Sequence, residues 1–222
     1  TGKSKIGWCK HVTAESIGRF VDEIGKDTQG IMKLTNYRII LASNSPRRKE
    51  LLSGIDIDYE VRALSNINES YPDNLPNEEV AEFLARKKAD AYLGSLVEND
   101  LLITADTIVL LENKILGKPL NKEDAKNMLH ELSGQTHLVI TGVCLTSKQK
   151  QVSFSDKTRV TFGDLTDQEI EYYVEKYNPL DKAGAYGVQE WIGYVGVEKI
   201  DGSYFNVMGL PIFKLYRELK QF

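Results

Sequence analysis

The chain has 222 residues, of which 41% are hydrophobic and 27% are charged, and its net charge is −4 at pH 7. This composition is ordinary for a globular protein with one sizeable core, and the acidic balance argues against an extended surface for nucleic acid or anionic membrane. No run approaches the roughly 18 apolar residues of a membrane span, and the two cysteines, Cys9 and Cys144, have no metal-ligand spacing, so we expect a cytoplasmic protein.

The first 31 residues differ from the rest of the chain. Apolar side chains recur there with the i, i+3, i+4, i+7 spacing of an amphipathic helix, from about Ala14 to Gly25. A polar linker with two glycines follows, and Met32 is a natural translation start just before the first strand. We therefore expect residues 1–31 to be an N-terminal extension of native or artificial origin, and residues 32–222 to form the functional domain.

The stretch from Arg38 to Gly54 predicts a strand, a tight turn and a helix. Arg38–Ala42 is a short apolar run with β-branched residues, which suits a buried strand. Ser43 and Ser45 favour a turn and a helix N-cap, and Pro46 is favoured at the first helical position.

Arg47 and Arg48 fall in the first turn of this helix. A helix N-terminus carries partial positive charge and prefers anions, so two cations there are unfavourable without a partner. Their guanidiniums, free backbone N–H groups and the hydroxyls of Ser43 and Ser45 would together form an anion pocket, most simply one for phosphate. The alternative is a solvated arginine pair on a surface helix.

Tyr59–Ala63 alternates like a second strand and leads into a polar loop that contains Glu69. A helix then begins at about Pro76. One stripe of this helix consists of Val80, Phe83, Leu84, Lys87 and Ala91. Lys87 and Lys88 could both lie on a solvated face, and only one of them is placed to turn inward beside the stripe.

Leu101–Leu111 is the most informative strand. Its near-continuous Leu, Ile and Val content predicts a strand buried on both faces, at the centre of an α/β sheet. Asp106 interrupts this run, and a buried charge costs several kcal/mol unless it is paired or binds a metal. We therefore interpret Asp106 as functional. The alternative is an aspartate at a strand bulge that backbone amides satisfy.

Gly117, Lys118 and Pro119 follow this strand. The glycine would let the backbone approach a ligand, and Lys118 could supply a point charge to phosphate. Taken alone, this tripeptide is a weak signal. The spacing of the apolar residues beyond it predicts a helix over Asn121–Gly134.

The second half of the chain mixes strands and helices. The predicted elements are a strand at 137–146, an antiparallel strand at 151–162, a helix that a capping box opens at Thr166, a glycine-rich loop at 181–189, a hairpin turn at Asp201-Gly202, a second turn at 206–209 and a terminal helix at 211–219. We predict an α/β domain with a mixed central sheet flanked by helices. No Walker or dinucleotide motif follows a strand, which weakens ATPase and nicotinamide-cofactor interpretations.

Six ordered blocks, from about Tyr37 to the C-terminus, together resemble the Maf family of nucleoside triphosphate pyrophosphatases. The blocks are LASNSPRRKELL, ADTIV, ILGKP, HLVITGV, DKAGAYGVQ and GSYFNVMGLP. The resemblance implies a Maf/ITPase-like fold and cleavage of a nucleoside triphosphate between its α and β phosphates, with Mg²⁺ or Mn²⁺. It also implies clearance of surplus or noncanonical nucleotides, a link to inhibition of septum formation, and a homodimer.

The resemblance also implies roles for single residues. Asp106 matches the proton acceptor of the family. Arg47, Thr107 and Gln189 match positions that distinguish the branch acting on dTTP and UTP from the branch acting on 7-methyl-GTP, and they agree with the pyrimidine branch. Further polar positions of the family pocket are matched by Glu69, Lys88, Lys118, Asp181 and Lys182.

The residue chemistry agrees with this mechanism. Cations at four positions, Arg47, Arg48, Lys88 and Lys118, would neutralise a triphosphate together with the metal. Asp106, with Glu69, would hold the metal or take a proton from the attacking water, and the sequence leaves both roles open. The Gln189 amide could read the O4/N3–H edge of uracil or thymine. The alternatives are a pyrophosphatase for a modified purine triphosphate and a nucleotide-binding regulator of septum formation; neither a nucleic-acid nor a membrane partner is expected.

Overall fold

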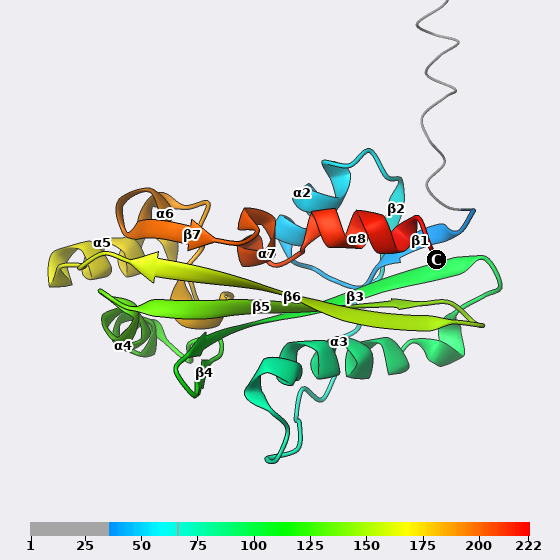
Figure 1. Cartoon of the computed structure of the whole chain (residues 1–222), viewed down its shortest axis with the longest axis horizontal. Helices are drawn as coiled ribbons and strands as arrows, with labels where there is room; N and C mark the ends of the chain where they lie inside the picture. Colours follow the sequence, from blue (N-terminus) through cyan, green and yellow to red (C-terminus); the bar gives the residue numbers. More distant parts are fainter. Residues whose placement is uncertain (1–35, 66) are drawn as a thin grey trace, which may run out of the picture. The chain divides into compact units, whose positions relative to one another are not determined.

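The computed structural model describes residues 36–65 and 67–222 (Figure 1). The predicted helix over 14–25 and the expected boundary after residue 31 lie outside these residues. Within the described residues, every helix is too short or too polar to cross a membrane.

The described residues form one mixed sheet of seven strands, which confirms the predicted architecture. The strands run in the order β2-β1-β3-β5-β6-β7, and β4 pairs with the far half of β3. β1 is parallel to both of its neighbours, and the other pairings are antiparallel. Their bounds are β1 Arg38–Leu41, β2 Tyr59–Val61, β3 Asp100–Leu111, β4 Lys114–Leu116, β5 Thr136–Thr146, β6 Gln151–Phe162 and β7 Val197–Asp201.

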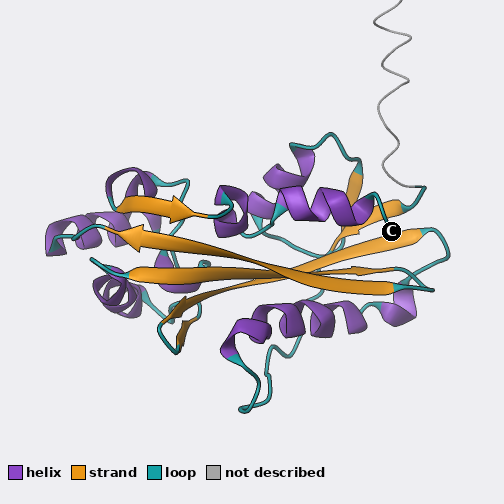
Figure 2. Cartoon of the chain, in the orientation of Figure 1, coloured by secondary structure: helices purple, strands orange, loops and turns teal. Residues whose placement is uncertain are grey.

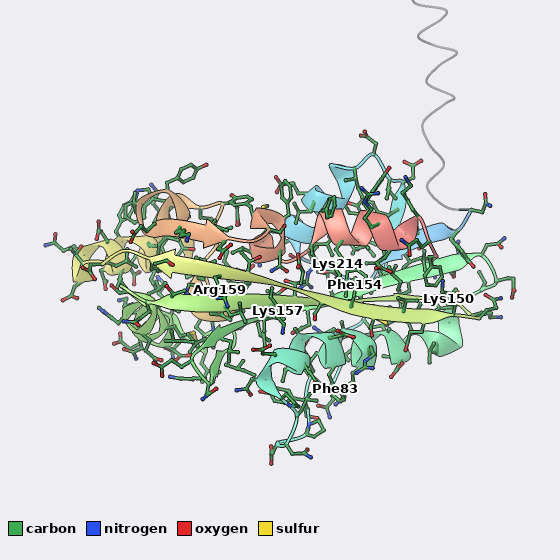
Figure 3. The ribbon with its side chains drawn as sticks, in the orientation of Figure 1. Phe83, Lys150, Phe154, Lys157, Arg159 and Lys214 are labelled. Atoms are coloured by element: carbon green, nitrogen blue, oxygen red, sulfur yellow. The ribbon has the colours of Figure 1, made fainter. Side chains whose placement is uncertain are left out.

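Helices cover both faces of the sheet (Figure 2). α3 packs on β3 and β5 from one side, and α7 packs on β5 and β6 from the other. Lys214 of α8 lies over the Phe154 ring of β6, 5.5 Å from its centroid, whereas Phe83 of α3 lies beyond the opposite face (Figure 3). The helix bounds are α2 Pro46–Ser53, α3 Val80–Asp90, α4 Lys122–Leu132, α5 Asp167–Tyr177, α6 Trp191–Val195, α7 Tyr204–Met208 and α8 Ile212–Leu219, with short 3₁₀ turns at Asn77–Glu79, Leu93–Ser95 and Ala183–Ala185.

The central strand β3 has a free stretch along one edge. β1 pairs with residues 100–103 of this strand, and β4 pairs with residues 109–111. Among the described residues, no strand pairs with that edge at residues 104–108. The apolar prediction for this strand is confirmed, because its residues are buried except for partial exposure at Asp106, Thr107 and Leu111.

Close packing brings α3 directly onto the centre of the sheet. A Cβ at Gly142 of β5 would lie 2.3 Å from backbone atoms of Ala81 and Glu82, so only glycine permits this approach. Ala81, Ala85 and Ala89 are small, buried and four residues apart, so they form one face of the helix. The Thr104 hydroxyl donates a 2.7 Å hydrogen bond to the Ala85 carbonyl, which fixes the helix on β3.

Several sequence predictions were wrong in detail. The buried stripe of α3 contains Val80, Ala81, Leu84, Ala85 and Ala89, whereas Phe83 and Lys87 are half-buried and Ala91 is exposed. Asp201-Gly202 is not a hairpin turn, since β7 ends there and Ser203 caps α7. The second predicted turn forms the end of α7, where Gly209 adopts a left-handed conformation with φ of 109°. The short elements β4 and α6 were not predicted.

Candidate active site

A cavity of about 490 Å³ lies beside the free stretch of β3. Its walls come from the turn after β1, the start of α2, the loop containing Glu69, α3, the segment after β4, the loop at 181–189 and the end of α7. All twelve residues that the sequence predicted for the site line this one cavity: Ser43, Ser45, Arg47, Arg48, Glu69, Lys88, Asp106, Thr107, Lys118, Asp181, Lys182 and Gln189.

Asp106 is paired with a lysine rather than with the backbone amides of a bulge. The ladder between β3 and β5 continues without a register shift through Asp106 and its partner Gly142. The Lys88 ammonium contacts Oδ1 of Asp106 and lies 2.9 Å from Oε1 of Glu69. The side chains of Asp106 and Lys88 are 13% and 15% exposed, so this pair is largely shielded from water. The charged residue in the apolar strand is therefore compensated from α3.

Lys88 is thus the lysine of α3 that turns inward. Lys87, which the sequence stripe favoured, instead donates to the backbone carbonyl of Ser70 at 2.6 Å and to its hydroxyl at 3.0 Å. The reason is the close seating of α3, whose alanine face rather than its Phe83 side meets the sheet.

Glu69 is held in its ionised form. Burial raises its pKa, but the hydrogen bond from Lys88 and the charges of Lys88 and Lys118 outweigh this effect, so the pKa lies below its usual value. Lys118 is exposed in the segment after β4. The loop at 181–189 is tied to the same segment, because the Gly184 N–H donates to the Gly117 carbonyl at 3.0 Å.

Glu69 and Asp106 suit a divalent cation whose remaining ligands come from the substrate. The Lys88 ammonium contacts Oδ1 of Asp106 and Oε1 of Glu69, so both carboxylates lie around one position and each has a second oxygen for a metal. Within the described residues, no group of three or more acidic, histidine or cysteine side chains gathers into a metal site. Mg²⁺ is commonly held by one or two carboxylates together with substrate phosphates. The donor set therefore fits such a metal.

The two arginines of α2 have different partners. Arg48 donates to the carbonyls of Gly209 and Ala105 at 2.8 Å and 3.0 Å, and to the Thr107 hydroxyl at 3.0 Å. Burial lowers the pKa of Arg48, but a guanidinium keeps its charge. Arg47 donates to Oδ2 of Asp181 at 3.0 Å. The alternative of a solvated arginine pair is wrong, because both guanidiniums are engaged by the cavity walls.

The start of α2 leaves backbone donors for an anion. Ser45 stands at the N-cap position without a side-chain hydrogen bond to the first turn, and Pro46 follows it. The Ser43 hydroxyl instead accepts from the Ser45 N–H at 3.2 Å. Since the first N–H groups of a helix lack intrahelical partners, this end of α2 suits a phosphate oxygen.

Gln189 carries a polar atom without a partner. Its Oε1 is buried and makes no hydrogen bond within the described residues. A Cβ at Gly187 would lie 2.9 Å from Nε2 of Gln189, so the loop backbone is folded closely against the amide. Because buried acceptors are nearly always satisfied, this oxygen calls for a donor from a ligand in the cavity.

Sequence reasoning missed the polar residues behind the cavity wall. The Thr107 and Thr141 hydroxyls lie 3.0 Å apart, and Thr141 donates to the Asn206 carbonyl at 3.0 Å. The Asn206 amide in turn donates to the Val139 carbonyl at 3.1 Å. Thr141 interrupts an apolar strand, as Asp106 does, and that signal could have found it. Asn206 gave none, because asparagine is common in turns and the sequence predicted a turn at this position.

Comparisons with known proteins show which family the chain resembles. Residues 38–222 match the family model described as Maf-like protein. A dTTP/UTP pyrophosphatase of Bacteroides fragilis is 60% identical over 191 residues, covering 86% of this chain and 99% of that protein. A dTTP/UTP pyrophosphatase of Parabacteroides distasonis is 58% identical over 189 residues, covering 85% of this chain and 98% of that protein. Among solved structures, a HAM1 protein from Coxiella burnetii aligns with a TM-score of 0.42 and 14% identity, over 84% of this chain and 100% of that chain.

Proposed function

The chain belongs to the family of Maf-like proteins, and from this premise we propose that it hydrolyses dTTP and UTP to the nucleoside monophosphate and pyrophosphate. The observation that carries the proposal is the convergence of cations, carboxylates and one unpartnered amide oxygen on a single cavity. The cations can bind the phosphates, the carboxylates can accept a proton or hold a metal, and the amide can hydrogen-bond the base.

The reaction joins a water oxygen to the α-phosphorus and breaks the bond from that phosphorus to the oxygen that leaves with pyrophosphate. A triphosphate carries about four negative charges, and charge accumulates on the leaving pyrophosphate, so fixed cations lower the barrier. Arg47, Lys118 and Lys182 reach the cavity with donors for the phosphates. Arg48 acts mainly through its charge and through Thr107, because three of its N–H groups already bind protein acceptors.

Asp106 accepts the proton of the attacking water. Its position on a central strand holds the carboxylate more rigidly than a loop would, and Lys88 keeps it oriented toward the cavity. Glu69, which is 49% exposed on its loop, has the freedom to follow a bound substrate. Glu69 and Asp106 would together hold Mg²⁺ or Mn²⁺, which supplies Lewis-acid stabilisation of the phosphate oxygens when bound.

Gln189 reads the base. The N3–H group of uracil or thymine is a donor that satisfies the buried Oε1, and O4 accepts from the Nε2 amide. Cytosine reverses this order, because its N3 is an acceptor and its N4 amino group is a donor, so an amide held in this orientation would set acceptor against acceptor and donor against donor with dCTP or CTP. Thr107, held between Arg48 and Thr141, is fixed in the wall of the same cavity.

The test is an assay of the purified protein with single nucleoside triphosphates, with Mg²⁺, with Mn²⁺ and with a chelator. We expect pyrophosphate and monophosphate in equimolar amounts from dTTP and UTP, and no turnover with the chelator. Release of orthophosphate would contradict the proposed cleavage. A preference for 7-methyl-GTP would favour the alternative of a pyrophosphatase for a modified purine triphosphate. Tight nucleotide binding without turnover would favour the alternative of a nucleotide-binding regulator. A cytoplasmic location and a homodimer stay predictions.

A further inference from the structure

A glutamate outside the cavity lining is joined to it through a buried lysine. Glu190 follows Gln189 in the chain, and it is not among the described residues that line the cavity. Its Oε1 lies 3.2 Å from the Lys182 ammonium, and its Oε2 accepts a hydrogen bond from the Tyr173 hydroxyl. Tyr173 is completely buried in α5, and its hydroxyl also accepts from the Gly187 N–H at 3.0 Å.

This contact belongs to a continuous series of alternating charges. Lys182 also donates to Oδ1 of Asp181 at 2.7 Å, and Oδ2 of Asp181 accepts from Arg47 at 3.0 Å. The series therefore runs from Tyr173 on α5 through the loop at 181–190 to α2. Burial raises the pKa of Asp181, but the hydrogen bonds from Lys182 and Arg47 outweigh it and keep the pKa below its usual value.

The two carboxylates that hold Lys182 differ in how firmly they are fixed. The Asp181 side chain is 56% exposed, and it shares its charge between Lys182 and Arg47. The Glu190 side chain is 21% exposed and is anchored by a buried hydroxyl. The loop backbone also closes on it, since a Cβ at Gly187 would lie 2.9 Å from the Glu190 carboxyl carbon. Glu190 is therefore the rigid partner and Asp181 the adaptable one.

A phosphate in the cavity would change these partners unequally. Arg47 and Lys182 both line the cavity, so an anionic ligand competes with Asp181 for both cations. Glu190 lies behind Lys182 and does not compete from the cavity side. The Lys182 side chain is only 8% exposed, and a desolvated ammonium needs a fixed counter-charge to stay in one position.

We propose that Glu190 is a positioning residue that fixes the Lys182 ammonium at the cavity wall and thereby sets the affinity for the phosphate chain of the substrate. Tyr173 holds the Glu190 carboxylate in the required orientation. The inference rests on the proposed function, since Lys182 needs an anionic ligand, but it concerns binding rather than turnover. Glu190 touches no reacting atom and so is not a catalytic residue.

The test is a double-mutant cycle with inorganic pyrophosphate as the probe, measured by calorimetric titration of the full chain. We expect Glu190→Gln to weaken pyrophosphate binding about tenfold, and to change it less than about twofold when Lys182→Met is already present. In steady-state assays with dTTP, the KM should rise by a similar factor while kcat stays within about twofold. Glu175→Gln is the matched control, because Glu175 pairs with Lys122 and Lys126 on the exposed side of α5.

The outcomes separate this inference from the proposed function. Equal losses with and without Lys182, unchanged affinity in Glu190→Gln, or no pyrophosphate binding by the wild type would each overturn the role of Glu190. Failure of the wild type to hydrolyse dTTP or UTP would instead overturn the proposed function. The double-mutant cycle with pyrophosphate would still test the role of Glu190. If Glu190→Gln does not fold, Tyr173→Phe keeps every charge and should weaken pyrophosphate binding about threefold, again only when Lys182 is present.

Discussion

Replacing Lys88 by methionine removes the ammonium that lies between Glu69 and Asp106. Both carboxylates contact that ammonium, and Asp106 and Lys88 are largely shielded from water. Methionine keeps the length and packing of the side chain but leaves two negative charges facing each other. The variant therefore isolates the electrostatic contribution of Lys88 from its contribution to packing on α3.

The expected loss of folding free energy can be estimated from the exposure of the partners. Removing one member of a fully buried ion pair costs about 3–5 kcal/mol. Glu69 is half-exposed and solvent screens its interaction, so we expect about 2 kcal/mol at pH 7 for Lys88→Met. Lys87→Met is the matched control one position earlier, because the Lys87 ammonium donates to the Ser70 carbonyl and hydroxyl at an exposed position. It should cost less than about 0.5 kcal/mol.

The loss should depend on pH in a definite direction. The pKa of Glu69 is lowered in the folded protein, so its stabilising interaction with Lys88 is complete above the unfolded-state pKa and disappears as the pH falls through the folded-state value. The difference between wild type and Lys88→Met should therefore be full at pH 7 and shrink toward pH 4. Urea denaturation at both pH values measures it. Equal stability of the Lys87 and Lys88 variants at pH 7 would refute the pairing.

The remaining predictions concern catalysis, base recognition and acid stability. Asp106→Asn should lower kcat for dTTP by about 10³-fold or more while the affinity for dTTP changes only a few-fold, and retained turnover would remove Asp106 as the proton acceptor. Gln189→Leu should raise the KM for dTTP and UTP by about 10–100-fold, since each lost hydrogen bond to a buried group costs about 1–3 kcal/mol. The ratio of kcat/KM for dTTP to that for dCTP should fall. An equal loss for all nucleotides would argue against recognition of the base by Gln189. Burial lowers the pKa of His137 to about 4, so the folded protein should lose on the order of 3 kcal/mol as the pH falls from about 6.5 to 4. His137→Gln should lack that part of the pH profile in urea denaturation, and an unchanged profile would show that another group causes it.

The sequence could single out the candidate site because several of its residues violate local expectations. Asp106 stands in a strand that is otherwise apolar, and Arg47 and Arg48 stand at the helix end that repels cations. Such conflicts need no knowledge of the tertiary structure, so they could be found from single residues and their neighbours. The mixed sheet and most long elements could be predicted for a similar reason, since their apolar periods are long and regular.

What could not be predicted depends on how the elements are seated against one another. Lys87 and Lys88 are adjacent on one helix, and the choice between them follows from the contact of Ala81 with Gly142, sixty-one positions apart in the chain. Glu190 has an ordinary sequence context, and its contacts with the buried Tyr173 hydroxyl and with Lys182 appear only in the folded chain. The prediction of a hairpin at Asp201-Gly202 was wrong because the same dipeptide also suits the connection from an edge strand to a capped helix.

The free stretch of β3 explains how neighbouring residues can serve one cavity. Successive side chains of a strand point to opposite faces, so Asp106 should face α3 and Thr107 should face α7. The contacts agree, because Asp106 meets Lys88 of α3 while Thr107 meets Thr141, which is bonded to Asn206 of α7.

Inside a fully paired sheet the side chains of Asp106 and Thr107 would lie on separate faces. Between β1 and β4 the edge at 104–108 carries no strand in the described part of the chain, so a ligand there can reach both faces around the edge. Arg48 marks this passage, since its guanidinium spans from the Ala105 carbonyl to the Thr107 hydroxyl. A single triphosphate can therefore meet the carboxylates on one face and the α2 cations on the other.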